Sequence, residues 1–335
     1  MTADPRTMRL LGLTRTMQQC PHYRGSNIMP LDPQIRALFG GGETLPSLPV
    51  SVEGMREFYR ARELPGQKIG QVASVVDRSI SGPGGPLAIR IYIPFGTGPF
   101  PLVLAFHGGG RVAGNLDSYD AGARNLCAGV SAVVVSVDYR LAPECPFPAA
   151  PDDCLAALNW AAEHAGELDV DARRIAVAGD SAGANLAAVT ALRGRDEGAP
   201  PLAGQLLVYP VMAHHSRATR SYEENAEGYL LTREVMEFFW SSYLDQPDQT
   251  RNVYAAPLAA TELTGLPPAM IITAEFDPLR DEGEEYGRRL REAGVPTEVH
   301  RFDGMIHGFF SLTGIVDAAD KAVGQACGWL RRVLT

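Results

Sequence analysis

A serine between two glycines is the residue of this chain best suited to nucleophilic chemistry. Residues 175–183 run from small apolar side chains into the pattern Gly179-Asp180-Ser181-Ala182-Gly183, and an alanine-rich segment follows. This order predicts a strand, a sharp turn and a helix, which together expose a serine hydroxyl at the edge of a sheet. The glycines leave room where the strand passes the helix. We therefore expect Ser181 to act as a nucleophile.

A glycine run after an earlier apolar segment is a candidate for binding an oxyanion. Acyl transfer places negative charge on a carbonyl oxygen, so it needs hydrogen-bond donors already in position. In His107-Gly108-Gly109-Gly110, the backbone N–H groups of Gly108 and Gly109, with that of Ala182, are predicted to supply three donors. For the glycines alone a plain turn is the alternative. The side chain of His107 is expected to anchor the loop.

The acid that would support such a serine should follow a later strand, because a nucleophilic serine on a strand–turn–helix is followed along the chain by its acid and then by its histidine. Asp277 comes directly after the apolar run 269–274, and Pro278 ends that strand. Glu275 would point the opposite way if the strand continued. Asp281 and Glu282 are expected to open a helix and to cap its N-terminus. We predict Asp277 as the acid.

Seven histidines compete for the role of the base. His300 lies inside the predicted strand 297–302, whereas His307 follows that strand in a loop. His214 and His215 begin a segment without regular pattern, so nothing in the sequence places them. His307 has the right position in the chain order and is predicted as the base.

Five motifs in one order resemble those of the bacterial hormone-sensitive-lipase-like esterases of the α/β-hydrolase superfamily. They span roughly residues 70–330 and are 107–110, 138–144, 179–183, 277–283 and 307–309. The resemblance implies an α/β-hydrolase fold with an eight-stranded, mostly parallel sheet flanked by helices and covered by a helical cap. It also implies a carboxylesterase without a cofactor or metal that uses a Ser–Asp–His triad.

Arg111 departs from that resemblance, because the family usually has a large apolar or aromatic residue there. We expect its side chain to line a substrate pocket and to influence the acyl or alcohol preference. Elsewhere, Arg140 and Glu144 are predicted to form an ion pair around Pro143. Asp180 is predicted to make a supporting hydrogen bond beside the nucleophile.

Short apolar runs alternate with helical patterns from about residue 68 onward, which is typical of a mostly parallel sheet. Strands are expected at 72–80, 87–93, 101–106, 132–137, 174–178, 205–209, 269–274 and 297–302, with helices at 117–129 and 151–165. The alternation stops at 211–260, where 231–244 is predicted as an aromatic-rich helix. We predict an N-terminal arm at 1–65 that contributes to the cap, with residues 1–29 poorly ordered. The α/β-hydrolase core is expected at 66–210 and 261–335, and a cap insertion at 211–260.

Composition limits the partners of this 335-residue chain. Its formal net charge of −9 disfavours nucleic acid and anionic membranes. No apolar run reaches the roughly 18–20 residues that span a bilayer, so integral membrane contact is not expected. The five scattered cysteines indicate free thiols in a cytoplasmic protein. The resemblance leaves a homodimer possible.

Taken together, these patterns predict hydrolysis of short-chain acyl esters through a covalent acyl-serine intermediate. Two alternatives stay open. One is an amide, lactam or carbamate hydrolase with the same triad, which must protonate a poorer leaving group. The other is a small-molecule-binding protein without catalytic activity, like the plant gibberellin receptors that resemble this family. In those receptors the histidine position is lost, whereas His307 is present here.

Overall fold

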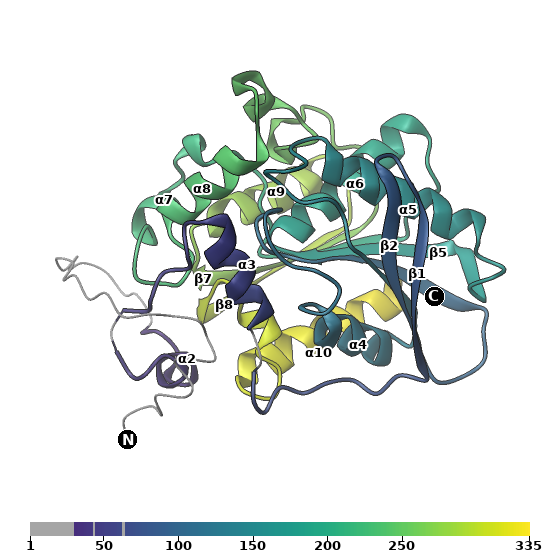
Figure 1. Cartoon of the computed structure of the whole chain (residues 1–335), viewed down its shortest axis with the longest axis horizontal. Coiled ribbons are helices and arrows are strands. Elements are labelled where there is room, and N and C mark those ends of the chain that lie inside the picture. Colours follow the sequence, from purple (N-terminus) through teal and green to yellow (C-terminus); the bar gives the residue numbers. More distant parts are fainter. Residues whose placement is uncertain (1–29, 43, 62–63) are drawn as a thin grey trace.

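The computed structural model describes residues 30–335 except 43, 62 and 63, so the predictions for residues 1–29 lie outside the described part of the chain. Within the described residues, eight strands form one sheet in the order β1-β2-β4-β3-β5-β6-β7-β8 (Figure 1). The strands are β1 Ser74–Gly82, β2 Gly85–Ile93, β3 Phe100–Phe106, β4 Val133–Val137, β5 Val170–Asp180, β6 Gly204–Val208, β7 Ala269–Phe276 and β8 Thr297–Ile306. β2 pairs antiparallel with β1 and β4, and the other neighbours are parallel. This confirms the predicted sheet.

Helices cover both faces of the sheet (Figure 1). α4 (Asp120–Val130) and α10 (Asp317–Val333) lie on one face, and α5 (Ala149–Glu163), α6 (Ala182–Glu197) and α9 (Arg280–Glu292) lie on the other. Alternate residues of each strand enter the two cores: Leu102 and Leu104 pack with the second group of helices, and Val103 and Ala105 pack with the first. Because both faces are buried, the central strands are continuous apolar runs.

A third apolar cluster joins two segments that are far apart in sequence. α3 (Val52–Arg60) contributes Met55 and Phe58, and α8 (Arg233–Tyr243) contributes Val235, Phe239 and Trp240. The shorter helices α2 (Pro33–Leu38) and α7 (Arg220–Glu224) belong to the same two segments, and Figure 1 shows α7 beside α8. Backbone hydrogen bonds from residues 45 and 48 to residues 228 and 230 also join them. We propose that the two segments together form the cap.

Several strands extend beyond their predicted ends, β5 and β8 by the most residues. β5 begins four residues early, at Val170, because that residue pairs with Phe100 of β3. β8 continues to Ile306, although Asp303-Gly304 is typical of a turn. The pairing of β7 with β8 is irregular between Ala274 and Phe276, so the strand passes this dipeptide and then resumes. No helix of the described residues is long and apolar enough to cross a membrane.

The predicted ion pair between Arg140 and Glu144 is wrong. Arg140 instead binds Asp153 of α5, with 2.8 Å between Nη2 and Oδ1, and Glu144 binds Arg56 of α3 at 2.6 Å. The Asp153 side chain is only 1% exposed, so its charge requires a partner inside the protein. Arg56 also donates to the carbonyl oxygen of Ala142. The two pairs therefore tie α3 and α5 to the loop after β4.

Arg111 is enclosed between α6 and α8. Its guanidinium carbon lies 4.0 Å from the ring centroid of Tyr243 and 4.7 Å from that of Trp240, and the residue is 1% exposed. Nη1 donates to Oδ1 of Asn185 in α6 at 3.2 Å. Burial lowers the pKa of Arg111, and no carboxylate of the described residues forms an ion pair with it. Its partners are therefore aromatic rings and an amide, which hold α8 against α6.

Replacing this buried guanidinium should weaken the fold. Arg111→Met removes the ring contacts and leaves the Asn185 oxygen without its donor, so we expect the free energy of unfolding to fall by about 1–3 kcal/mol. Urea denaturation measures this change. Arg288→Met is the control, because that side chain is 58% exposed in a surface ion pair and should change stability by less than about 0.5 kcal/mol. Equal effects of the two substitutions would contradict the enclosed role of Arg111.

Candidate active site

Ser181 occupies a strained turn between β5 and α6. Its φ of 55° and ψ of −119° are rare for a residue with a side chain, and such strain persists only where neighbours enforce it. The Ser181 N–H donates to Val208 O of β6 at 2.8 Å. A side chain at Gly183 would collide with the backbone of Phe106, and one at Gly179 would collide with Gly183 itself. The prediction that glycine is needed at both positions is confirmed.

Three side chains from three strand ends meet at this turn. His307 Nε2 lies 2.9 Å from Ser181 Oγ, and His307 Nδ1 lies 2.7 Å from Asp277 Oδ2. Ser181 follows β5, Asp277 follows β7 and His307 follows β8, so the parallel sheet brings their loops to one edge. Ser181 and His307 are each 8% exposed and Asp277 is fully buried. In this geometry the imidazole can accept the serine proton while the carboxylate holds the ring.

The competing acids have other partners. Oε2 of Glu275 accepts the Gly304 N–H at 2.7 Å. Oε1 of Glu282 accepts the N–H groups of Met212 and Ala213, and burial raises the pKa of Glu282 well above its usual range. Asp281 and Glu282 lie in the first turn of α9, as expected, but the prediction that they cap its N-terminus is wrong. The cap position is Leu279, which has no polar side chain, and the two carboxylates bind backbone groups of the segment 212–221.

The loop after β3 is held by its first residues. His107 stacks on Tyr139 with 4.3 Å between ring centroids, and its Nδ1 lies 2.8 Å from Gly108 O, as expected for an anchor. The Gly108 N–H donates to Asp180 Oδ1 at 2.9 Å, so Asp180 makes the supporting bond that was predicted. This bond also corrects the expectation for Gly108, because an N–H that is already donated cannot serve an oxyanion.

The next two glycines, Gly109 and Gly110, have backbone N–H groups without an acceptor among the described residues. Gly109 and Gly110 have φ values of 110° and 65°, which side chains rarely adopt. Ala182 is the first residue of α6, where an N–H lacks an acceptor within the helix. These three N–H groups are available to a ligand beside Ser181.

The other residues singled out in the sequence are distributed around this centre. His300 lies on β8 beside Glu298, as predicted. His214 contacts the ring of Trp240 in α8. Arg111 reaches away into the contact between α8 and α6 and is not among the residues that line the cavity described next.

A cavity of about 530 Å³ lies beside the serine turn, within the usual size of small-molecule sites. Asp180, Gly108 and Tyr209 line its inner end, and the ring of Tyr209 packs 4.5 Å from that of His307. Its wall combines apolar side chains, such as Tyr59 and Phe310, with polar ones that include Asp117 and Asp120. No lysine or arginine is among the described residues that line it, and no three His, Cys, Asp or Glu side chains of the described chain are grouped as a metal site requires.

Sequence reasoning missed three residues near the centre. Tyr209 stands at the carboxyl end of a predicted strand, which is a signal that could have drawn attention to it. Ser221 and Asn225 contact the turn that carries Asp277, but they lie in the segment without regular pattern. Nothing in the spacing of residues 211–260 indicates either of them.

Comparison with known proteins places this geometry in a family. The model for the alpha/beta hydrolase fold matches residues 103–311. The chain is 45% identical to esterase LipI of Mycobacterium tuberculosis, over 86% of this chain and 90% of that protein. It is 41% identical to carboxylesterase NlhH of the same organism, over 91% and 96%.

A solved structure agrees with these relatives. The esterase of Pyrobaculum calidifontis has a TM-score of 0.84 and 39% identity to this chain, covering 90% of it and 99% of that chain. The matched region contains the serine turn, the glycine loop, the acid and the histidine in their expected order. This chain therefore belongs to the alpha/beta hydrolase family, in the branch that resembles hormone-sensitive lipase.

Proposed function

We propose that this chain is a carboxylesterase that hydrolyses short-chain acyl esters through a covalent acyl-serine intermediate. The observation that carries the proposal is the unbroken chain of hydrogen bonds from Ser181 through His307 to Asp277. The names of the relatives support the ester bond as the target, since LipI and NlhH are an esterase and a carboxylesterase. The complete chain of bonds favours a catalytic protein over a binding protein.

In the proposed reaction, Ser181 Oγ attacks the ester carbonyl carbon while His307 Nε2 takes its proton. Asp277 accepts a hydrogen bond from the Nδ1–H group of His307. This bond keeps the ring in the productive tautomer and stabilises the imidazolium. The tetrahedral intermediate collapses as His307 protonates the leaving alcohol oxygen. Water, deprotonated by the same imidazole, then attacks the acyl-enzyme, and release of the acid restores Ser181.

The oxyanion would be bound by the N–H groups of Gly109, Gly110 and Ala182. This set replaces the one expected from sequence, because Gly108 donates to Asp180 instead. That bond has its own use: it fixes the start of the loop to the residue next to the nucleophile, so the two following N–H groups are held relative to Ser181. Preorganised donors of this kind are each worth about 3 kcal/mol of transition-state stabilisation.

The cavity beside Asp180 is proposed to hold one arm of the ester. Its aromatic and aliphatic side chains can contact an uncharged group. Three aspartates (Asp117, Asp120 and Asp180) and no lysine or arginine are among the described lining residues, so a carboxylate would meet like charge there. A short neutral acyl chain fits this surface. Cleavage of an amide, lactam or carbamate would use the same triad, but no contact of the described residues favours it over ester cleavage.

Ester hydrolysis should depend on the Ser181 hydroxyl. With p-nitrophenyl esters from acetate to palmitate, we expect a burst of nitrophenol and the highest kcat/KM for short chains. Ser181→Ala should lower kcat by about 10⁴-fold or more. Ser241→Ala, an exposed serine of α8, is the control and should retain activity. Hydrolysis that survives Ser181→Ala, or an optimum at palmitate, would contradict the proposal.

The anchor of the oxyanion loop should make the fold sensitive to acid. Burial lowers the pKa of His107 to about 4, whereas an unfolded histidine titrates near 6.5. The unfolded chain therefore binds this proton at a higher pH, so stability is lost as pH falls from about 6.5 towards about 4.

The variant His107→Asn removes this titration. We expect the slope of unfolding free energy against pH to fall, within that window, by up to about 1.4 kcal/mol per pH unit. His214, whose pKa burial also lowers to about 4, continues to contribute in both proteins. Urea denaturation at several pH values measures the slopes. Identical slopes would show that His107 does not stay neutral in the fold.

A further inference from the structure

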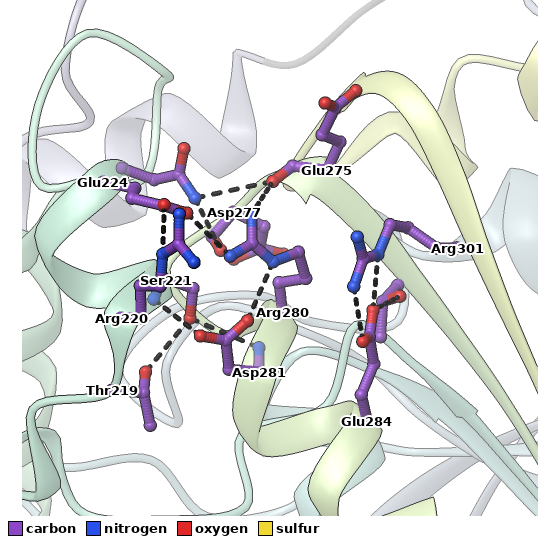
Figure 2. Close-up of polar contacts among 12 residues, drawn as sticks. Thr219, Arg220, Ser221, Glu224, Glu275, Asp277, Arg280, Asp281, Glu284 and Arg301 are labelled. Carbon is purple, nitrogen blue, oxygen red and sulfur yellow. Dashed lines mark hydrogen bonds and ion pairs between the residues drawn. The ribbon is translucent and has the colours of Figure 1, made fainter. Parts of the chain in front are cut away.

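The turn that carries Asp277 is bound by a helix of the cap insertion (Figure 2). Ser221, in α7, donates its hydroxyl to Pro278 O at 2.6 Å and its N–H to Asp281 Oδ2 at 2.8 Å. The Asp281 N–H returns a bond to Ser221 Oγ at 3.2 Å. Ser221 is fully buried, so these bonds are shielded from water. One residue of the insertion thus holds both ends of a four-residue turn.

Asn225 directly follows α7 and binds the same turn from another side. Its Nδ2 donates to the carbonyl oxygen of Asp277 at 3.2 Å and reaches that of Glu275 at 3.5 Å. The residue is 3% exposed. Its N–H donates to Ser221 O, so the two contacts form one unit. The backbone of the proposed acid is therefore fixed by a side chain of the insertion.

Arg280 also joins α7 to the turn that carries Asp277 (Figure 2). Its Nη1 donates to Glu275 O at 3.1 Å, and its Nη2 donates to Glu224 of α7 at 2.8 Å. Its Nε binds Asp281 at 2.8 Å. Turn and helix are thus joined by a charged bridge at the rim and by neutral hydrogen bonds in the buried centre.

The carboxylate of Asp277 has few bonds of its own. Oδ1 accepts the Leu279 N–H at 2.8 Å, and Oδ2 faces His307. Its direction therefore depends on the backbone of residues 275–281. Within the turn, the Arg280 N–H donates to the Asp277 carbonyl oxygen at 3.1 Å. Because α9 begins without a side-chain cap, the other hydrogen bonds described above that hold this backbone come from the Arg280 side chain and from Ser221 and Asn225 of the insertion. A small shift of the turn would misalign the imidazole, and catalytic geometry tolerates little misplacement.

We propose that Ser221 and Asn225 are positioning residues for the hydrolytic reaction, acting through Asp277 on the orientation of His307. The inference rests on the proposed function, because it requires Asp277 to be the triad acid. Neither residue is assigned a contact with the substrate. Their effect should therefore appear in kcat and leave KM nearly unchanged.

Single substitutions make the first part of the test. Asn225→Ala and Ser221→Ala should each lower kcat for p-nitrophenyl acetate by about tenfold and change KM by less than about twofold. Glu223→Ala, an exposed residue of the same helix, is the control and should change neither. Ser221→Thr keeps the hydroxyl and should restore most of the activity. All variants are assayed at a temperature where circular dichroism shows them folded.

A double-mutant cycle with Asp277→Asn makes the second part, since residues that act through one another are not additive. In the Asp277→Asn background, the loss caused by Asn225→Ala should shrink from about tenfold to less than about twofold. A full tenfold loss in that background would overturn the inference, as would a rise in KM in place of a fall in kcat. If Asn225→Ala does not fold, the same cycle is run with Ser221→Ala.

The cycle also separates this inference from the function on which it rests. If Asp277→Asn alone leaves kcat unchanged, the proposed triad fails. If Asp277→Asn lowers kcat strongly but the losses are additive, the triad stands and only the positioning role is wrong.

Discussion

The strained backbone at Ser181 is the constraint on which the rest of the site depends. A residue with φ of 55° and ψ of −119° must be held by its surroundings. The N–H is bound by β6, and the glycines on either side let β3 and α6 approach within contact of the turn. The strain is thus distributed over three central strands, and the serine hydroxyl reaches the sheet edge where the loops after β7 and β8 also end.

The loops at that edge impose a second constraint, because their backbone N–H and C=O groups are not paired by the sheet. Buried N–H and C=O groups need partners. Polar side chains from distant segments supply them here: Asn185 donates to Val211 O and Ala255 O, and Glu282 accepts from Met212 and Ala213. The buried polar residues around the site therefore hold loops in place. Arg111, next to the glycine loop, is linked to this group through its bond to Asn185.

The sequence predicts the parts of this arrangement that depend on local pattern. Apolar runs locate the strands, and strand ends followed by serine, aspartate and histidine locate three side chains that do meet. Hydrogen bonds and ion pairs between residues far apart in sequence cannot be predicted from local pattern. The residues near Arg140 and Glu144 in sequence do not indicate that their partners are Asp153 and Arg56. Likewise, the Gly108 N–H is occupied only because the Asp180 carboxylate lies within hydrogen-bond distance of it. Ser221 and Asn225 lie in an insertion whose residues follow no period, so their role becomes visible only when the chain is folded.

The insertion has a different relation to each of the three side chains. Ser181 is held by the sheet, and His307 packs against Tyr209 at the end of β6. The turn of Asp277 receives buried side-chain hydrogen bonds from the insertion, and it leads into a helix without a side-chain cap. The aspartate is also the group farthest from the bond that breaks, so the reaction reaches it only through the imidazole. A cap helix that contacts this turn can affect the rate without touching the substrate. Under the proposed positioning role, the insertion is part of the catalytic geometry.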